Sequence, residues 1–198
     1  MNEIQEDLAK EAEISNVRIL AWENLVNSIY KTADTNLIAG FLIIDSLIFN
    51  DTSLDKHKIS DLHFIKGDIY FRIDSLEESV AEFTISGEKY NMRAPKVLAA
   101  RAAAYIKLKQ YDCAYADLRE AAKINYDYFW NIGNYYEVIS NKDSAISYYT
   151  RLYNQDTIIY GFCQDRIKEL MNPKTKLLTE LIYRDRDRMV FLMKGVVE

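Results

Sequence analysis

The sequence contains little proline and little glycine. Its 198 residues include only two prolines and six glycines. Folds rich in β-sheet need many tight turns, for which these two residue types are favoured. No stretch alternates strictly between apolar and polar residues, as a half-buried strand would. Composition and pattern together predict an all-α protein built from long helices.

Cysteines and long apolar runs are also scarce. The two cysteines, Cys113 and Cys163, are too few for a disulfide framework, and each lies within a helical pattern. We therefore expect both to be small buried hydrophobic residues in a reduced compartment. The longest apolar run, residues 37–44, is too short to span a bilayer. The first ten residues are acidic and predict no signal peptide, so we expect a cytoplasmic protein.

Residue combinations that carry chemistry are few. His57 and His63 are six positions apart, so they would not share one face of a helix as metal ligands do. The sequence has no glycine-rich phosphate loop and suggests no cysteine–histidine pair for nucleophilic catalysis. Its net charge of −5 provides no general attraction to nucleic-acid phosphates. These features predict a protein that is not an enzyme, uses no cofactor or metal, and binds no nucleic acid.

Apolar residues recur at steps of three and four along most of the chain, which predicts nine or ten helices. Ser60 is expected to cap one helix, and Asp74 with Glu77 forms a capping box for the next. Pro95 and Pro173 are each expected in the first turn of a helix, where a missing N–H costs nothing. The expected helices cover residues 3–30, 35–49, 60–73, 74–90, 95–109, 112–124, 127–139, 141–153, 156–171 and 173–193.

A pattern of small and large residues occurs three times between residues 60 and 154. In each unit a small residue precedes a tyrosine by three positions, a second small residue follows nine positions later, and a large residue comes after four more. The period is 35 residues, then 31. Small residues let two helices approach closely, and stacked hairpins bury the apolar faces that remain. The three sets are Gly67, Tyr70, Ser79 and Phe83; Ala102, Tyr105, Ala114 and Leu118; and Gly133, Tyr136, Ala145 and Tyr149.

The stretch from Arg101 to Ala121 resembles a tetratricopeptide repeat, and the resemblance extends over residues 60–154. It implies a right-handed superhelical solenoid of antiparallel helix pairs within one domain, residues 1–198. Residues 1–59 would then form N-terminal helices or a divergent repeat, followed by three repeats in 60–154. Residues 155–198 would form a degenerate repeat and a C-terminal capping helix.

The resemblance also implies a concave groove lined by the first helix of each repeat, which would bind a protein or peptide of unknown identity. No membrane association is expected, and the chain would be a monomer or a weak homo-oligomer. The expected groove residues are Phe64, Asp68, Phe71, Arg72, Lys96, Ala99, Ala103, Lys107, Trp130, Asn134 and Glu137.

Two kinds of alternative stay open at this point. Phe64, Phe71 and Trp130 are groove aromatics in one interpretation and core or hairpin-contact residues in the other. The chain as a whole is a binding scaffold, a peptide-sensing regulatory domain or, less favoured, an RNA-binding helical-repeat protein. Helical-repeat RNA readers carry basic grooves, whereas the groove expected here has mixed charge.

Overall fold

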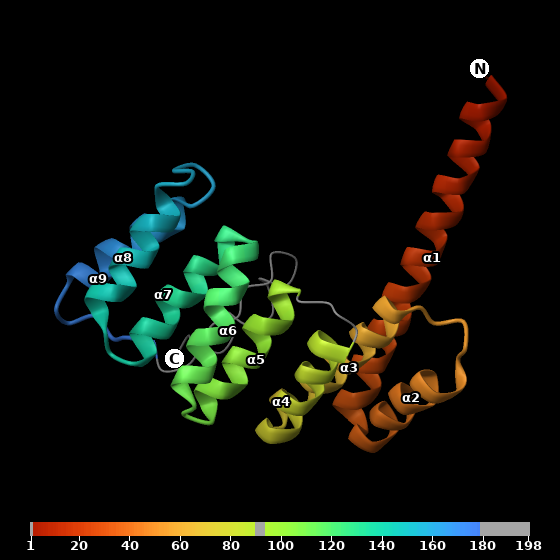
Figure 1. Ribbon diagram of the computed structural model, residues 1–198, viewed down its shortest axis with the longest axis horizontal. Coiled ribbons are helices and arrows are strands. Elements are labelled where there is room, and N and C mark those ends of the chain that lie inside the picture. The colour runs from red at the N-terminus through yellow and green to blue at the C-terminus, as the bar shows by residue number, and fades with distance from the viewer. Residues whose placement is uncertain (1, 90–93, 179–198) are drawn as a thin grey trace.

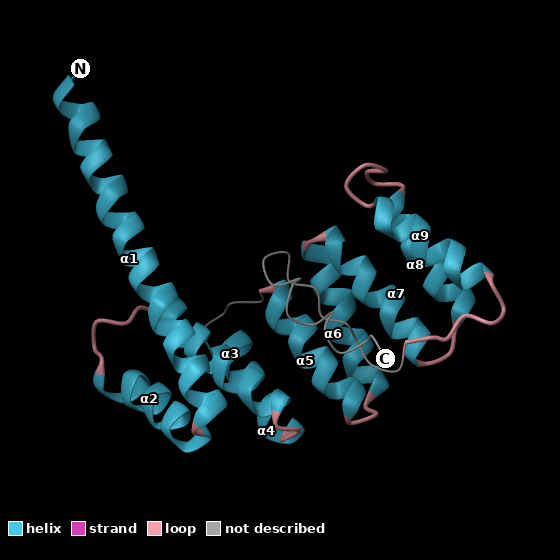
Figure 2. Ribbon diagram, turned by 180° about the vertical axis from the view of Figure 1, so that it is seen from behind, coloured by secondary structure: helices cyan, strands magenta, loops and turns pink. Residues whose placement is uncertain are grey.

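A computed structural model describes residues 2–89 and 94–178, and this part of the chain contains helices and loops but no strand (Figure 2). The all-α prediction is therefore confirmed. Short π and 3₁₀ turns follow α4 and α6, at Ile85–Lys89 and Tyr126–Tyr128. The α-helices of the described part are α1 (Asn2–Thr35), α2 (Leu37–Asn50), α3 (Lys56–Arg72), α4 (Leu76–Thr84), α5 (Pro95–Lys107), α6 (Tyr111–Ile124), α7 (Phe129–Val138), α8 (Lys142–Tyr153) and α9 (Gly161–Met171).

The helices pack in the order in which they follow along the chain. Helices α3 and α4, α5 and α6, and α7 and α8 form three hairpins, and α4 contacts α5, α6 contacts α7 and α8 contacts α9. Figure 1 shows these hairpins side by side, with α1 and α2 beyond α3 and with α9 at the opposite end. Each hairpin therefore buries its apolar faces against its neighbours in sequence.

The three hairpin turns have the same backbone structure. In each, the residue four positions after the repeat tyrosine has a positive φ, and the next N–H donates to that tyrosine's carbonyl. This is the geometry of a Schellman helix end. The sequence period is therefore also a structural period. The residues with positive φ are Asp74 (63°), Lys109 (59°) and Ser140 (61°), and the closing hydrogen bonds are Ser75 N to Tyr70 O (3.0 Å), Gln110 N to Tyr105 O (2.8 Å) and Asn141 N to Tyr136 O (2.7 Å).

The small and large residues of the pattern face one another within the hairpins. A Cβ placed on Gly67 would lie 2.8 Å from the ring of Phe83, and one on Gly133 would overlap the ring of Tyr149. Ser79 strengthens the first of these contacts, because its hydroxyl donates to the carbonyl of Gly67 at 2.8 Å. At both positions the absence of a side chain lets an aromatic ring lie directly on a helix backbone.

Helix α1 continues five residues beyond the expected end at residue 30. Two threonines in this extension bond back to the helix: Thr32 Oγ1 donates to the carbonyl of Ser28 at 2.8 Å, and Thr35 Oγ1 to that of Thr32 at 3.0 Å. Such back-bonding lets these polar residues remain inside a helix. The next helix is capped by Asn36, whose side chain accepts from the N–H of Ala39.

Two predicted caps were wrong. Ser60 lies buried inside α3, where its hydroxyl donates to the carbonyl of Ser86 at 2.9 Å; the cap of α3 is Asp55. Asp74 adopts the left-handed conformation of the hairpin turn, and α4 begins after Ser75 with no side-chain capping bond. Pro95, by contrast, occupies the first turn of α5 as predicted.

The predicted last helix does not begin at Pro173. Residues 172–174 form a turn in which Asn172 Oδ1 accepts from the N–H of Lys174 at 3.0 Å, and residues 175–178 are not helical. The remainder of that predicted helix, residues 179–193, lies outside the described residues. The cysteine prediction was half right, because Cys163 is buried but Cys113 is exposed.

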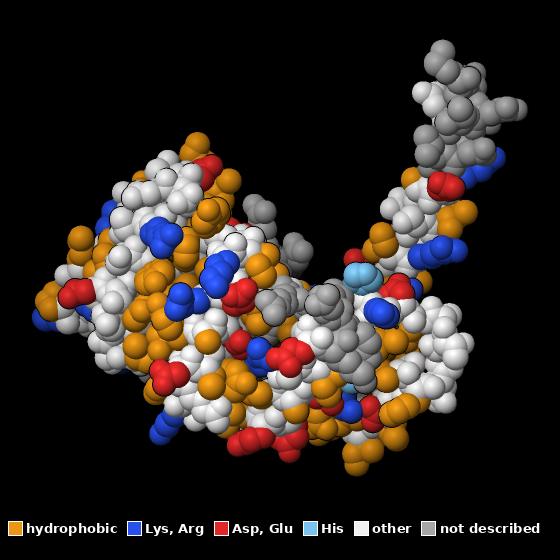
Figure 3. All heavy atoms as spheres, viewed as in Figure 1, with side chains coloured by type: hydrophobic (Ala, Val, Ile, Leu, Met, Phe, Trp, Pro, Cys, Tyr) orange, Lys and Arg blue, Asp and Glu red, His pale blue; other side chains and the backbone are white. Residues whose placement is uncertain are grey.

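The hydrophobic core occupies the stacked hairpins rather than the start of α1. Residues 11–20 of α1 are all exposed, including Ile14, Val17 and Leu20. Figures 1 and 3 show this part of α1 standing apart from the other helices, with hydrophobic side chains on its surface. Within the described part of the chain, no helix combines the length and the hydrophobicity that a bilayer span requires.

Candidate functional site

The predicted groove residues of α3 and α5 meet in two cation–aromatic pairs. The ammonium group of Lys107 lies 4.7 Å from the ring centre of Phe71, and that of Lys96 lies 5.1 Å from the ring centre of Phe64. Both lysines come from α5 and both rings from α3, so the pairs join the first helices of two successive hairpins. Such contacts stabilise by roughly 0.5–1 kcal/mol at exposed sites.

Each of these lysines also pairs with a carboxylate. Lys107 Nζ lies 3.1 Å from Asp74, and Lys96 Nζ lies 3.4 Å from Asp61. These two aspartates were not among the predicted site residues, because sequence alone does not show which residues of α3 and of the turn after it lie beside α5. The lysine side chains remain partly accessible, 30% exposed for Lys107 and 41% for Lys96.

The other two charged residues of this group lie on α3 and pair with each other. Arg72 Nε is 3.1 Å from Asp68, one helical turn earlier, and the guanidinium group also lies 3.7 Å from Asp34 of α1. The same group lies 4.7 Å above the ring of Tyr30. Arg72 therefore connects α3 to the end of α1 as well as facing solvent.

Ala99 and Ala103 do not line an open surface. Both lie in the core, at 0% and 5% exposure, as members of the large hydrophobic cluster that extends from α5 to α9. Alanine is small enough to let α5 approach its neighbours, which explains why these positions are buried while Lys96 and Lys107 at the ends of the helix are not.

The predicted residues on α7 are buried. The ring of Trp130 packs against Tyr149 and Phe162, with ring centres 4.7 and 4.9 Å away. Of the two interpretations of this tryptophan, the core interpretation is correct. Asn134 and Glu137 are both fully buried, at 0% exposure.

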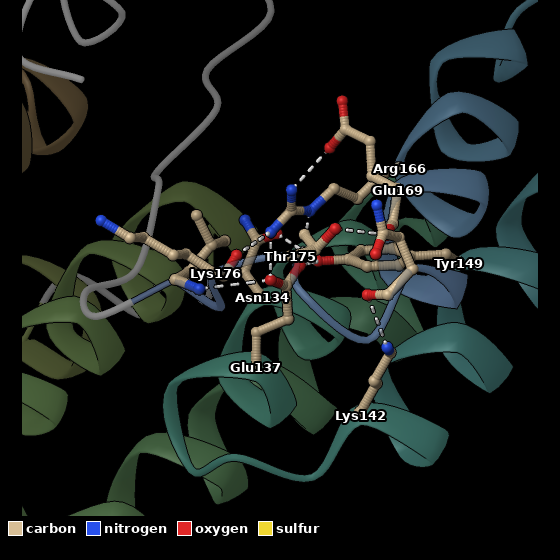
Figure 4. A network of polar contacts seen from close by, with 10 residues as sticks. Asn134, Glu137, Lys142, Tyr149, Arg166, Glu169, Thr175 and Lys176 are labelled. Carbon is tan, nitrogen blue, oxygen red and sulfur yellow. Dashed lines mark hydrogen bonds and ion pairs between the residues drawn. The ribbon is translucent and has the colours of Figure 1, made fainter. Parts of the chain in front are cut away.

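Glu137 is the centre of a polar network that connects α7, α8 and α9 (Figure 4). Its Oε1 lies 2.7 Å from the hydroxyl of Tyr149 and 3.0 Å from Nε of Arg166, while its Oε2 accepts from Nη2 of the same arginine. The tyrosine hydroxyl is also 2.7 Å from Oδ1 of Asn134. A buried carboxylate is costly unless paired and hydrogen-bonded, and here both of its oxygens have partners.

The electrostatics of the network follow from this burial. The hydrogen bond to Glu137 raises the pKa of Arg166 above its already high usual value. Burial, and then the nearby carboxylate, raise the pKa of Tyr149 well above the usual value for a phenol. Both groups therefore keep their protons throughout the physiological range.

The segment of residues 172–178 crosses this network from the end of α9 (Figure 4). The N–H of Leu178 donates to Oε2 of Glu137 at 3.2 Å, and Arg166 Nη2 donates to the carbonyl of Lys176 at 3.4 Å. Leu177 packs against the hydrophobic cluster beneath. The sequence pattern did not indicate Arg166, because this residue lies in the degenerate repeat. Residues 173–178 were predicted to be helical.

Groupings typical of metal sites are not seen in residues 2–89 and 94–178: these contain no cluster of three or more His, Cys, Asp and Glu side chains placed to hold a metal ion. His63, which the sequence analysis did not favour as a metal ligand, lies with Nδ1 2.7 Å from Glu82 of the neighbouring helix.

No family model matches the chain, and no curated protein matches it. The resemblance to tetratricopeptide repeats therefore rests on the residue pattern of 60–154.

Proposed function

We propose that this chain is a non-catalytic protein- or peptide-binding scaffold of the tetratricopeptide type. In this proposal the hairpins wind into a right-handed superhelix, and the first helices α3, α5, α7 and α9 line its concave groove. The ligand contacts the partly exposed side chains of α3 and α5.

The observation that carries the proposal is the pair of lysine–phenylalanine contacts between α3 and α5. Lys107 over Phe71 and Lys96 over Phe64 place aromatic rings and partly exposed cations along two adjacent first helices. Aromatic and cationic side chains are typical anchors for peptide recognition.

The charge on this surface favours a peptide over a nucleic acid. Each of the three cations, Arg72, Lys96 and Lys107, has a carboxylate within 3.4 Å. Cations already paired in this way gain less from contact with phosphates, and the chain as a whole carries a charge of −5.

Selection from a display library of short random peptides tests the proposal. Peptides selected on the wild-type protein should bind Phe71→Ala and Lys107→Ala on the order of tenfold more weakly, which corresponds to about 1.4 kcal/mol. Fluorescence anisotropy with the selected peptides measures the change.

Arg151→Ala is the matched control. Arg151 lies 4.4 Å over the ring of Phe129, so the variant removes the same type of contact from the second helix of a hairpin. It should leave peptide affinity unchanged. Equal binding by Lys107→Ala, Phe71→Ala and the wild type would exclude the α3–α5 surface as the site.

A further inference from the structure

A non-helical length of the chain already lies at the seam between α7 and α9. Residues 175–178 are not helical, and two of their main-chain groups bond to the buried ion pair: the carbonyl of Lys176 to Arg166 and the N–H of Leu178 to Glu137. In an extended chain the carbonyl of one residue and the N–H two residues later point to the same side. The ion pair thus provides a donor and an acceptor at the spacing that a neighbouring strand would provide.

Recognition of this kind does not depend on which side chains the bound segment carries, since every extended peptide presents the same carbonyl and N–H groups. Selectivity comes from the residue between them. Leu177 lies partly buried against the hydrophobic cluster, whereas Lys174 and Lys176 are exposed. The seam therefore fits an extended peptide with a leucine that follows polar residues.

The segment is tethered close to the seam rather than built into the core. It leaves α9 through the turn at Asn172, whose carbonyl accepts from Lys142 Nζ at 3.3 Å, and Thr175 Oγ1 donates to the carbonyl of Glu169 at 2.6 Å. A short tether gives a segment a high effective concentration at its own site, so it outcompetes a weak ligand from solution.

We propose that the α7–α9 seam is a peptide-binding site that residues 172–178 occupy in cis, and that a leucine-containing extended peptide binds there by displacing them. This inference rests on the proposed function and adds a second site and its regulation to it. The apparent affinity for an external peptide is then reduced by the fraction of molecules in which the segment is bound. Loosening the segment should raise that affinity.

The probe is a fluorescently labelled peptide with the sequence of residues 172–178, added to full-length protein. Leu177→Asn removes the apolar contact of the segment and leaves α7 and α9 unchanged. Lys176→Asn introduces the same residue one position earlier, where the side chain is exposed. We expect Leu177→Asn to bind the probe roughly tenfold more tightly than the wild type, and Lys176→Asn to bind it as the wild type does.

Methylated probes test where the peptide binds without altering the protein. N-methylation at the residue equivalent to Leu178 removes the N–H that Glu137 accepts and should abolish binding to Leu177→Asn. N-methylation at the residue equivalent to Lys176 should have little effect, because in the cis segment only the carbonyl of that residue bonds to the seam. Equal sensitivity to the two methyl groups would overturn the assignment.

Hydrogen exchange in the wild type covers the case in which Leu177→Asn does not fold. If the segment leaves the seam, the Leu178 amide should exchange faster than the amides of α7. If the Leu178 amide and the α7 amides exchange only through global unfolding, the segment is a fixed cap and the inference is overturned. Equal probe affinity of the wild type, Leu177→Asn and Lys176→Asn would also overturn it, as would no probe binding to folded Leu177→Asn. None of these results bears on the α3–α5 surface, which the library-selected peptides test separately.

Discussion

The carboxylate of Glu137 on α7 and the guanidinium group of Arg166 on α9 form an ion pair across 29 residues of sequence. The carboxylate is 0% exposed and the arginine side chain 17% exposed. Three helices and the segment of residues 172–178 meet at this ion pair, so we expect it to stabilise this end of the stack.

Replacing Arg166 with methionine should be strongly destabilising. The substitution keeps the apolar stem but leaves the Glu137 carboxylate buried without its cation, a change that typically costs about 3–5 kcal/mol. Urea unfolding followed by circular dichroism measures the loss. The control is Lys168→Met on the same helix, where the pair with Asp165 is exposed and 3.7 Å long. Exposed pairs contribute about 0–1 kcal/mol, so a similar loss in both variants would contradict the importance of burial.

Gly133→Ala should destabilise the third hairpin. The added methyl group would overlap the ring of Tyr149, which is itself held by hydrogen bonds and cannot move freely. Overpacking of this kind costs about 1–3 kcal/mol, read from the midpoint of thermal unfolding. Gly161→Ala provides the comparison, because nothing lies within 4 Å of a methyl group there. It should leave the midpoint unchanged or raise it, as alanine favours helix over glycine.

Lys109→Gly should stabilise the second hairpin by roughly 0.5–1 kcal/mol. Lys109 has a φ of 59°, a conformation that costs a residue with a Cβ about 1 kcal/mol more than glycine. Its side chain is exposed, so little contact is lost. Lys123→Gly, in the last turn of α6, should instead destabilise, since the backbone there is helical. A lower unfolding midpoint for Lys109→Gly would contradict this account of the turn.

Trp130→Ala and Lys107→Ala should separate stability from binding. Trp130 is buried against Tyr149 and Phe162, and removal of a core tryptophan typically costs about 3–5 kcal/mol. Lys107 is exposed and contributes one cation–aromatic contact and one surface ion pair. Its substitution should change the free energy of unfolding by less than about 1 kcal/mol. Denaturant titration of both variants checks the contrast; equal losses would place Lys107 in the fold rather than at its surface.

Much of the fold was predictable because its determinants are local in the chain. Apolar spacing predicted the helices, and the recurrence of Gly67 and Gly133 before large aromatic residues predicted which helices pair. The predicted caps failed at Ser60 and Asp74, since a serine or aspartate serves equally as a cap, a buried hydrogen-bonding residue or a turn residue. Only the neighbouring helix decides between these roles.

The candidate sites were less predictable, for a related reason. Periodicity put Trp130, Asn134 and Glu137 on one face of a helix, yet it could not show whether that face is open or covered. Residues 172–178 cover Glu137, and they do so through the main chain, which leaves no trace in the residue types.

By itself, then, the sequence determined an all-helical chain with three hairpins of a common pattern, because helix periodicity and close packing at small residues act over a few tens of residues. Tertiary structure alone decided that Glu137 pairs with Arg166, that Lys107 lies over Phe71, and that a non-helical segment lies at the α7–α9 seam. Each of these depends on the relative positions of helices from different hairpins.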